Sequence, residues 1–219
     1  SESQPWQTLT KVNGFYFKPG DQILFKRGNS WNGTITISGS GSSGSPITYG
    51  AYGSGEKPKI SGSEVISGWT KHSGNIYKAT FSKTVTQIFV SGDRMQNARY
   101  PNDDYFFISS VVDAQKFTSS QLDGGINYKG ATWLGRMVRL RLIPRTVTSS
   151  SSTTLALDSE PLFGLKEDIT FFLCNKLEFL DMPGEWYYDV ATKTVYLWTK
   201  NGDSPANYVV KGSTDDYGF

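Results

Sequence analysis

The sequence predicts a mainly β protein made of many short strands. Glycine accounts for 23 of the 219 residues, and 14% of the residues are aromatic. Isoleucines at positions 23, 35, 47 and 60 recur roughly every dozen residues, each in a short run bounded by Gly, Pro, Ser or Asn. Such runs are too short for helices and too regular for a loop region. Residues 17–62 are therefore predicted to wind through short strands, each of which needs the next one to bury its apolar side.

The segment before these strands is predicted to form a cap. Trp6, Leu9 and Val12 are spaced by three residues and would share one face of a short helix or irregular lid. Such a lid would cover the open end of a stack of strands, where unpaired edges otherwise invite aggregation. Alternating apolar and polar residues then predict strands at residues 22–26, 31–38, 46–49 and 59–60.

Four short motifs in this region resemble a known family. They are Pro19-Gly20-Asp21, Trp31-Asn32-Gly33, Pro46-Ile47-Thr48 and the run from Lys57 to Gly62. Together they resemble the N-terminal opening of secreted bacterial right-handed parallel β-helix proteins, a family that includes many polysaccharide lyases and glycoside hydrolases. The resemblance covers about a quarter of the chain. It implies that this region forms the first coils of a solenoid, and that catalytic residues lie on later coils.

From about residue 65 the short β-rich runs no longer recur at a regular spacing. The run from Gln87 to Gln96, with Gly92 between two β-rich segments, predicts a hairpin. Alternation predicts one strand at residues 135–143, with Arg139 and Arg141 on a solvated face, followed by a polar loop at 146–154. Residues 171–180 are predicted to form a short helix, and strands at 185–189 and 194–198 are joined by a tight turn.

This second part also resembles the β-helix family. The runs from Ala98 to Asn102 and from Leu180 to Asp189 look like segments of the β-barrel or sandwich domain inserted near the start of many such enzymes. The predicted organisation is a cap with the first coils at residues 1–64, a β-sandwich or barrel-like inserted domain at 65–210, and a return segment at 211–219. The solenoid would then lack most of its coils, so we expect an open apolar edge after the first ones.

The best candidate for a binding site is the loop at residues 99–105. It holds an arginine, an amide, two carboxylates and two aromatic rings. Planar polar groups suit sugar hydroxyls, and aromatic rings stack on the C–H faces of sugars; a structural loop, with its arginine paired to a carboxylate, would use the same residues. The strand at 185–189 adds aromatic residues, for which core packing is the alternative role. The predicted carbohydrate-binding residues are Arg99, Tyr100, Asn102, Tyr105, Trp186 and Tyr188.

No catalytic residues, cofactor or metal site are predicted. Glu185 with Asp181, or Asp103 with Asp104, could be an acid/base pair, but sequence cannot place two carboxylates on opposite sides of a bond. His72 is the only histidine and Cys174 the only cysteine, which excludes multi-histidine and structural zinc sites within the chain. Cys174 lies in an apolar run and is expected to be a buried, inert thiol.

Charge and composition limit the classes of binding partner that we expect for this chain. The net charge of +2 gives no overall field for holding a polyanion, so nucleic acid is not expected as a partner. No apolar stretch has transmembrane length. The expected partners are a polysaccharide or oligosaccharide and, at the open end, the remainder of the β-helix or another copy of the chain.

Three hypotheses for the function remain at this point. The first is a non-catalytic N-terminal portion of a secreted or cell-surface bacterial β-helix protein that acts on polysaccharide, capping the helix and binding carbohydrate. The second is a glycoside hydrolase or polysaccharide lyase whose active site lies within these residues. The third is a structural cell-surface or adhesin module.

Overall fold

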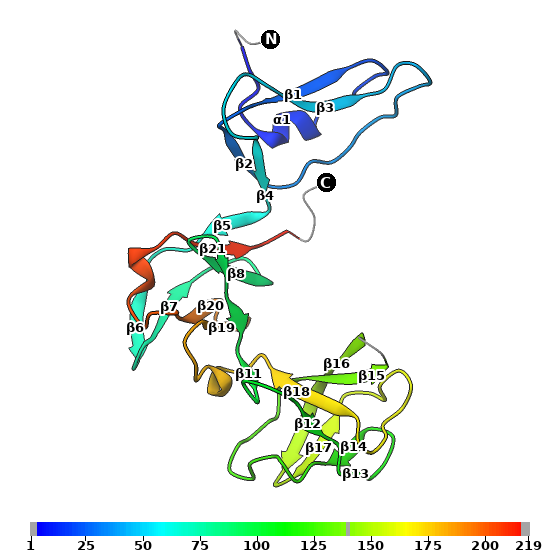
Figure 1. Cartoon of the computed structure of the whole chain (residues 1–219), viewed down its shortest axis with the longest axis vertical. Helices are drawn as coiled ribbons and strands as arrows, with labels where there is room; N and C mark the ends of the chain where they lie inside the picture. The colour runs from blue at the N-terminus through cyan, green and yellow to red at the C-terminus, as the bar shows by residue number, and fades with distance from the viewer. Residues whose placement is uncertain (1–3, 139–140, 216–219) are drawn as a thin grey trace. The chain divides into compact units, whose positions relative to one another are not determined.

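The computed structural model describes residues 4–138 and 141–215 (Figure 1). The chain divides into two compact units, of which unit 1 comprises Ser1–Ile66, Val85–Ile88 and Val210–Phe219, and unit 2 comprises Ser67–Thr84 and Phe89–Val209. The predicted boundaries at residues 64 and 210 stay predictions. Among the described residues, no helix is long and apolar enough to cross a membrane.

Unit 1 begins with the predicted cap. Helix α1 (Leu9–Asn13) starts at Thr8, whose hydroxyl accepts a hydrogen bond from the Lys11 N–H, and it buries Leu9 and Val12. A side-chain acceptor at this position satisfies one of the N–H groups that the first helical turn leaves without a partner. The helix packs its apolar side on Phe17, Ile23, Phe25 and Ile35. The apolar spacing correctly predicts a short helix with Leu9 and Val12 on its buried face, but Trp6 precedes the helix and is 41% exposed.

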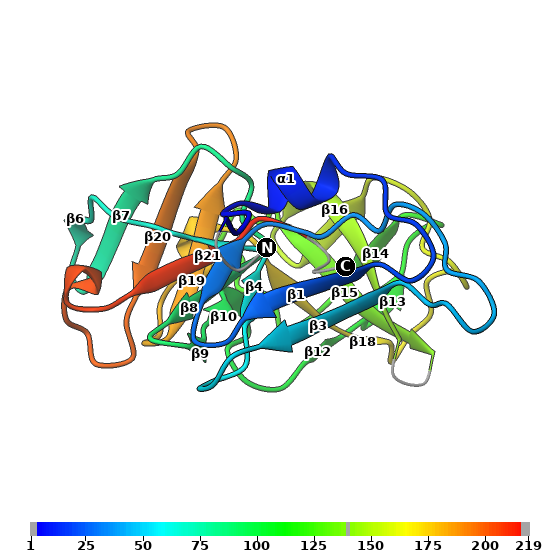
Figure 2. The same ribbon diagram turned by 90° about the horizontal axis from the view of Figure 1, so that it is seen from above.

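The strands of unit 1 pair in parallel across long connections. Strand β1 (Gln22–Lys26) pairs with β3 (Thr48–Tyr52), and β2 (Ser30–Asn32) pairs with β4 (Lys59–Ser61). The predicted strand at 31–38 is shorter than expected because Gly33, with φ of +113°, ends it. Ile35 is nevertheless buried, whereas Ile37 is 60% exposed. Figure 2 draws β1 between α1 and β3.

A third sheet follows in unit 1, where β5 (Ser63–Val65), β21 (Val210–Ser213) and β8 (Gln87–Val90) are neighbours in that order. Strand β8 begins in unit 1 and ends in unit 2, where Phe89 and Val90 pair with β9 (Asp93–Arg94). The predicted hairpin is confirmed: Ser91 and Gly92 both have positive φ, the conformation that a two-residue type I′ turn requires.

One sheet of unit 2 has five strands in the order β10-β19-β20-β7-β6 (Figure 2). The predicted strands and tight turn near the C-terminus are confirmed, because β19 and β20 form an antiparallel hairpin. The bounds are β6 (Thr70–Ser73), β7 (Ile76–Thr80), β10 (Gln96–Asn97), β19 (Glu185–Asp189) and β20 (Thr194–Trp198), and a 3-10 turn, η2 (Pro205–Asn207), follows β20.

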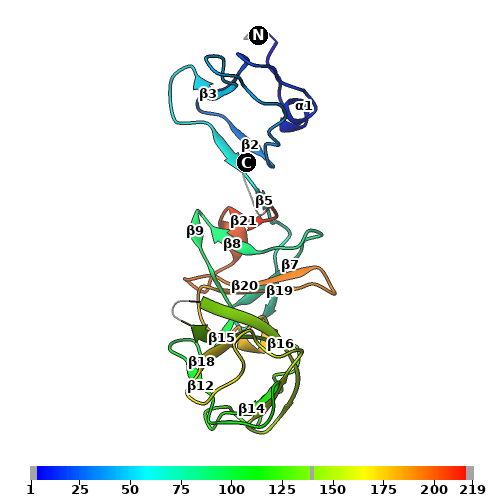
Figure 3. The same cartoon turned by 90° about the vertical axis from the view of Figure 1, so that its right-hand side faces the viewer.

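The second sheet of unit 2 has eight strands, seven of them in the order β11-β18-β15-β16-β17-β14-β13, with β12 also paired to β18 (Figure 1). Figure 3 labels β12, β14, β15, β16 and β18 of this sheet in a second view. The strands are β11 (Arg99–Tyr100), β12 (Phe106–Phe107), β13 (Ser110–Val111), β14 (Lys116–Thr118), β15 (Thr132–Val138), β16 (Arg141–Ser151), β17 (Thr154–Leu157) and β18 (Thr170–Cys174). The long strand β16 pairs with β15 through its first half and with β17 through its second.

Three local predictions for this sheet are wrong. Residues 135–143 form not one strand but the ends of β15 and β16, which pair antiparallel at Val138 and Arg141; Arg139 lies outside the described residues. Residues 146–154 are mostly strand rather than loop, since the polar face of β16 is solvated while Val147 points inward. The helix expected at 171–180 is strand β18 followed by a single 3-10 turn, η1 (Leu177–Phe179).

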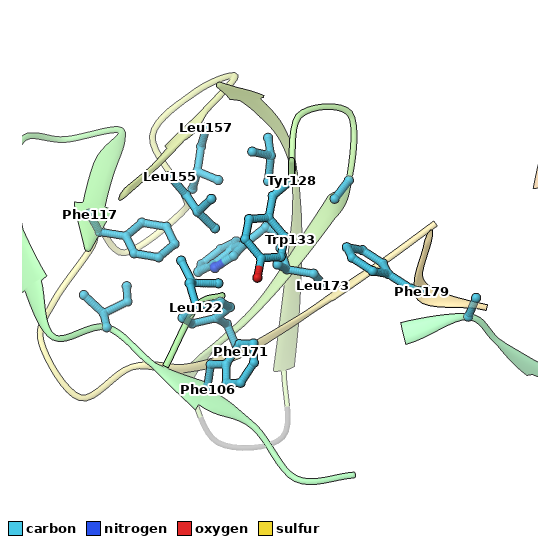
Figure 4. Close-up of a cluster of buried hydrophobic side chains, with 14 of the residues drawn as sticks. Phe106, Phe117, Leu122, Tyr128, Trp133, Leu155, Leu157, Phe171, Leu173 and Phe179 are labelled. Atoms are coloured by element: carbon cyan, nitrogen blue, oxygen red, sulfur yellow. The ribbon is translucent and has the colours of Figure 1, made fainter. Parts of the chain in front are cut away.

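The core of unit 2 is a large aromatic and aliphatic cluster held by this sheet (Figure 4). Trp133 on β15, Phe117 on β14 and Phe171 on β18 are fully buried, with ring centroids 5.2 to 6.0 Å apart. Rings at these separations contribute packing energy beyond the area that they bury.

The prediction of a mainly β protein is confirmed, with several sheets, almost no helix, and no closed barrel among the described strands.

Candidate functional site

Arg99 is the centre of the candidate site in unit 2. Strand β11 places Arg99 opposite Cys174 of β18, and the guanidinium carbon lies 4.1 Å from the centroid of the Phe172 ring and 5.6 Å from that of Tyr105. Nη2 of Arg99 also donates to the backbone carbonyl of Asp104. The guanidinium therefore stacks on an aromatic ring and holds the loop that follows its own strand.

Asn102 joins this loop to a second segment. Its Nδ2 donates to Oδ1 of Asp181 at 2.7 Å, across 79 residues of sequence. Asn102 is partly exposed and Asp181 is exposed. Oδ1 of Asn102 is buried without a hydrogen-bond partner, so the exposed carboxylate of Asp181 is the acceptor that this pair offers to a polar ligand.

Glu185 lies beneath this pair and is only 2% exposed. Its Oε1 accepts the N–H of Arg99 at 3.3 Å, and its Oε2 accepts the N–H groups of Asp181 and Met182 at 3.3 and 3.4 Å. Burial raises the pKa of Glu185 to about 7; the hydrogen bonds from the backbone lower it, and the nearby charge of Asp181 raises it. Because Glu185 is enclosed and bound to backbone amides, its role here is to tie β11 to the 181–182 segment.

The other three predicted site residues pack inward. Tyr100 stacks on Phe179, with ring centroids 5.7 Å apart and an interplanar angle of 16°. Trp186 and Tyr188 are 3% and 5% exposed, and they donate hydrogen bonds to the backbone carbonyls of Met95 and Phe81. Their buried rings offer no face to a ligand in this structure, which matches the alternative role of core packing.

The structure therefore brings together Arg99, Asn102 and Tyr105 of the six predicted residues. Phe172 is the member that sequence reasoning missed. It points to the same side as Arg99 because β18 alternates, with Phe171 and Leu173 buried and Phe172 partly exposed. The alternation of β18 is a usable signal, but a short apolar run also fits the buried helix predicted at residues 171–180. A carbohydrate-binding role for these residues stays a prediction.

Two further side chains with reactive groups are Cys174 and His72. Cys174 is partly exposed rather than buried, and desolvation raises its pKa to about 11, which keeps the thiol protonated near neutral pH. His72 packs edge-on against Tyr196 at 5.0 Å. Within residues 4–138 and 141–215, no three His, Cys, Asp or Glu side chains are grouped so as to hold a metal ion.

Comparison with known proteins gives relatives that are much longer than this chain, and no family model matches. Over 132 residues, 55% of this chain, the sequence is 30% identical to a lacto-N-biosidase of Bifidobacterium longum subsp. longum, of which the match covers 8%. A solved structure described as a glycoside hydrolase superposes with a TM-score of 0.69 and 20% identity over 90% of this chain and 39% of its own. A second solved structure, described as a complex of XylC with xylose, superposes with a TM-score of 0.51 and 16% sequence identity. The superposition covers all of this chain and 30% of the XylC chain.

These comparisons show that the fold recurs as part of larger proteins. The chain spans less than half the length of each of the proteins that it matches. At 20% and 16% identity, the two solved structures share the fold alone with this chain.

Proposed function

We propose that this chain is a non-catalytic N-terminal portion of a secreted bacterial polysaccharide-active protein, where it binds carbohydrate and caps a right-handed parallel β-helix. The observation that carries the proposal is the 30% identity with a small part of a lacto-N-biosidase. The superposition on 39% of a glycoside hydrolase supports a contributing domain rather than a whole enzyme.

The parallel pairs β1–β3 and β2–β4 support the β-helix part of the proposal. Two pairs of parallel strands, joined by long connections and covered by α1, are what the opening coil of a solenoid requires. In this proposal residues 1–64 form the cap and first coils, 65–210 a sandwich or barrel-like inserted domain, and 211–219 the return to the coils. The open end would receive the remaining coils or another copy of the chain.

The cluster of Arg99, Asn102, Tyr105 and Asp181 supports carbohydrate binding by unit 2. It combines a partly exposed aromatic ring with an amide and a carboxylate, held in place by the Arg99–Phe172 stack and by Glu185. These are the group types that bind sugar hydroxyls and sugar C–H faces.

Affinity electrophoresis through gels containing xylan, mannan, galactan or pectin tests this proposal. We expect at least one polysaccharide to retard the wild-type chain, and Asn102→Ala or Tyr105→Ala to reduce the retardation severalfold. Tyr77→Ala is the matched control, since Tyr77 is also partly exposed but lies on β7. Unretarded wild-type protein on every gel would refute the binding role.

The second candidate function is catalysis within this chain, as a glycoside hydrolase or polysaccharide lyase. It is favoured by the descriptions of the two relatives named as glycosidases. Release of reducing sugar, or of unsaturated products that absorb in the ultraviolet, by the chain alone would establish it in place of the non-catalytic role. A protein that neither binds nor cleaves glycan but captures a cell-surface protein would favour the adhesin alternative.

A further inference from the structure

A groove in unit 1 lies along the free side of strand β1. It has a cavity volume of about 880 Å³. All five residues of β1, from Gln22 to Lys26, line it, as do residues 5–8 from the segment that leads into α1. Consecutive strand residues point to opposite faces, so a groove lined by all five runs along the edge of the strand. A volume of this size is in the range of small-molecule sites.

The backbone of β1 adds polar groups to this edge. Among the described strands β1 pairs with β3 alone. Thr48 donates its N–H to the carbonyl of Asp21, and Arg27 donates its N–H to the carbonyl of Tyr52. Because the backbone groups of a strand alternate in direction, those of Gln22, Leu24 and Lys26 point away from β3, toward the groove.

Two indole rings from separate segments also line the groove. Trp6 is 41% exposed, and its ring packs on Phe15 and Phe17 with centroids 5.3 and 6.3 Å away. Trp31 is partly exposed on β2 and packs edge-on against Phe25 at 5.1 Å. Both rings are thus held by neighbouring rings while part of their surface stays accessible, which suits stacking on a flat, partly apolar ligand.

The polar lining is almost entirely uncharged. Side-chain amides of Gln7, Gln22 and Asn29 are joined by hydroxyl groups, and Lys26 is the one charged side chain among the lining residues of the described chain. Amides and backbone groups both donate and accept hydrogen bonds, as sugar hydroxyls do. A lysine on a strand edge is a feature by which proteins discourage pairing with another strand, so a peptide occupant is disfavoured.

From this combination we infer that the groove along β1 is a second carbohydrate subsite, separate from the Arg99 cluster, which takes a short stretch of oligosaccharide. The inference rests on the proposed carbohydrate-binding function and adds the place and chemistry of a site in unit 1. Trp6 and Trp31 stack on sugar rings, and Gln22 and Asn29 bind hydroxyls. Lys26 lies where a uronic acid carboxylate would gain a charge-assisted hydrogen bond.

This inference can be tested by titrating the full chain with xylotetraose, cellotetraose and tetragalacturonate. Calorimetry measures the binding, and NMR monitors the indole N–H signals. We expect the Trp6 and Trp31 signals to shift with at least one of these sugars. Trp6→Ala should weaken binding tenfold or more, and Asn29→Ala, at an exposed position where folding is not at risk, severalfold. Lys26→Gln should weaken only tetragalacturonate if the site prefers acidic sugars, and none of the sugars if it prefers neutral ones.

Tyr16→Ala is the matched control, because Tyr16 is 70% exposed in the same unit and does not line the groove. Binding that survives Trp6→Ala and Asn29→Ala but is lost with Asn102→Ala would overturn the groove while leaving the proposed function intact. Absence of binding to any sugar by the wild-type chain would overturn both. Indole shifts caused by an extended peptide and by none of the sugars would make the groove a peptide site instead.

Discussion

The ring of Trp133 lies directly over Gly135, two residues further along strand β15. A Cβ atom placed on Gly135 would come 1.8 Å from Cη2 of Trp133 and 2.3 Å from its Cζ2. Side chains two apart on a strand point to the same face, so the indole can fold along its own strand only because the next inward position carries no side chain. Trp133 is fully buried in the core of unit 2, which makes this glycine a packing requirement.

Gly135→Ala is therefore expected to destabilise unit 2 strongly. The added methyl must displace a buried indole that touches Phe117 and Phe171, and overpacking of this kind typically costs about 1–3 kcal/mol. Urea denaturation followed by tryptophan fluorescence measures the loss. Gly124→Ala is the control, because the nearest atom to its added Cβ is 3.4 Å away.

A double-mutant cycle separates the steric effect from loss of glycine flexibility. Combined with Trp133→Leu, the alanine at position 135 should cost much less than it does in the wild-type background, since the ring that it strikes is gone. Equal costs in the two backgrounds would contradict the packing explanation.

The stack of Arg99 on Phe172 leads to a second prediction. Arg99→Lys keeps the charge but loses the planar group that stacks at 4.1 Å and donates to the Asp104 carbonyl. We expect a loss of stability of about 1 kcal/mol, together with faster amide hydrogen exchange in the 100–105 loop. Phe172→Leu should produce the same local loosening, because it removes the ring and leaves the arginine.

The matched control for this prediction is Arg27→Lys. Arg27 is also partly exposed, and it donates to the Gly55 carbonyl at 3.4 Å. An equal loss of stability in the two variants, with hydrogen exchange in the 100–105 loop unchanged, would show that the aromatic stack does not hold the loop.

The contacts Trp133–Gly135 and Arg99–Phe172 also bear on how much of this structure can be predicted from the sequence alone. The hairpins were predictable because their turn residues, such as Gly92, are local signals. The apolar run at Phe171 to Cys174 was not, since a short apolar run fits a strand or a buried helix equally well. Arg99 and Phe172 are 73 positions apart, and their contact depends on the register between β11 and β18, which no local pattern contains. Alternation placed Trp186 and Tyr188 on one face, but only the packing of β19 decides that this face is the core.

A third prediction concerns Asp189 at the β19–β20 turn. Its Oδ1 accepts the N–H groups of Ala191 and Thr192 at 2.9 and 3.3 Å, and its Oδ2 accepts the Thr192 hydroxyl at 2.8 Å. These bonds, that of the Thr192 hydroxyl first, lower the pKa of Asp189. Stabilisation by the ionised carboxylate is therefore present above the pKa of the unfolded chain and is lost as pH falls through the lower folded-state pKa.

Asp189→Ala should cost about 1 kcal/mol at pH 7, as expected for the loss of a turn held by side-chain hydrogen bonds. Thermal denaturation at pH 7 and pH 3 measures this loss of stability. The difference in stability between the variant and wild type should be smaller at the lower pH. Asp103→Ala, at an exposed loop position, is the control and should change little. A gap that is the same at both pH values would mean that the charge of Asp189 plays no part.

The last prediction is a pH dependence set by Glu185. Burial raises its pKa from 4.5 to about 7, so between these values the folded chain binds a proton that the unfolded chain has released. Stability then falls as pH rises from about 4.5 through 7, and it is constant with respect to this group above that range. At about 1.4 kcal/mol for each pH unit, the full change is about 3.5 kcal/mol at most.

Glu185→Gln removes this titration, because an amide cannot ionise. The amide oxygen can accept from the Arg99 N–H or from the N–H groups of Asp181 and Met182, but not from both sides. The variant is therefore expected to be less stable than wild type at pH 5, and the difference should shrink or reverse by pH 8. Urea denaturation of both proteins between pH 5 and pH 8 provides the comparison. Glu178→Gln, at an exposed residue paired with Lys176 at 3.3 Å, should leave the wild-type slope unchanged. Parallel curves for wild type and Glu185→Gln would show that Glu185 does not titrate in this range.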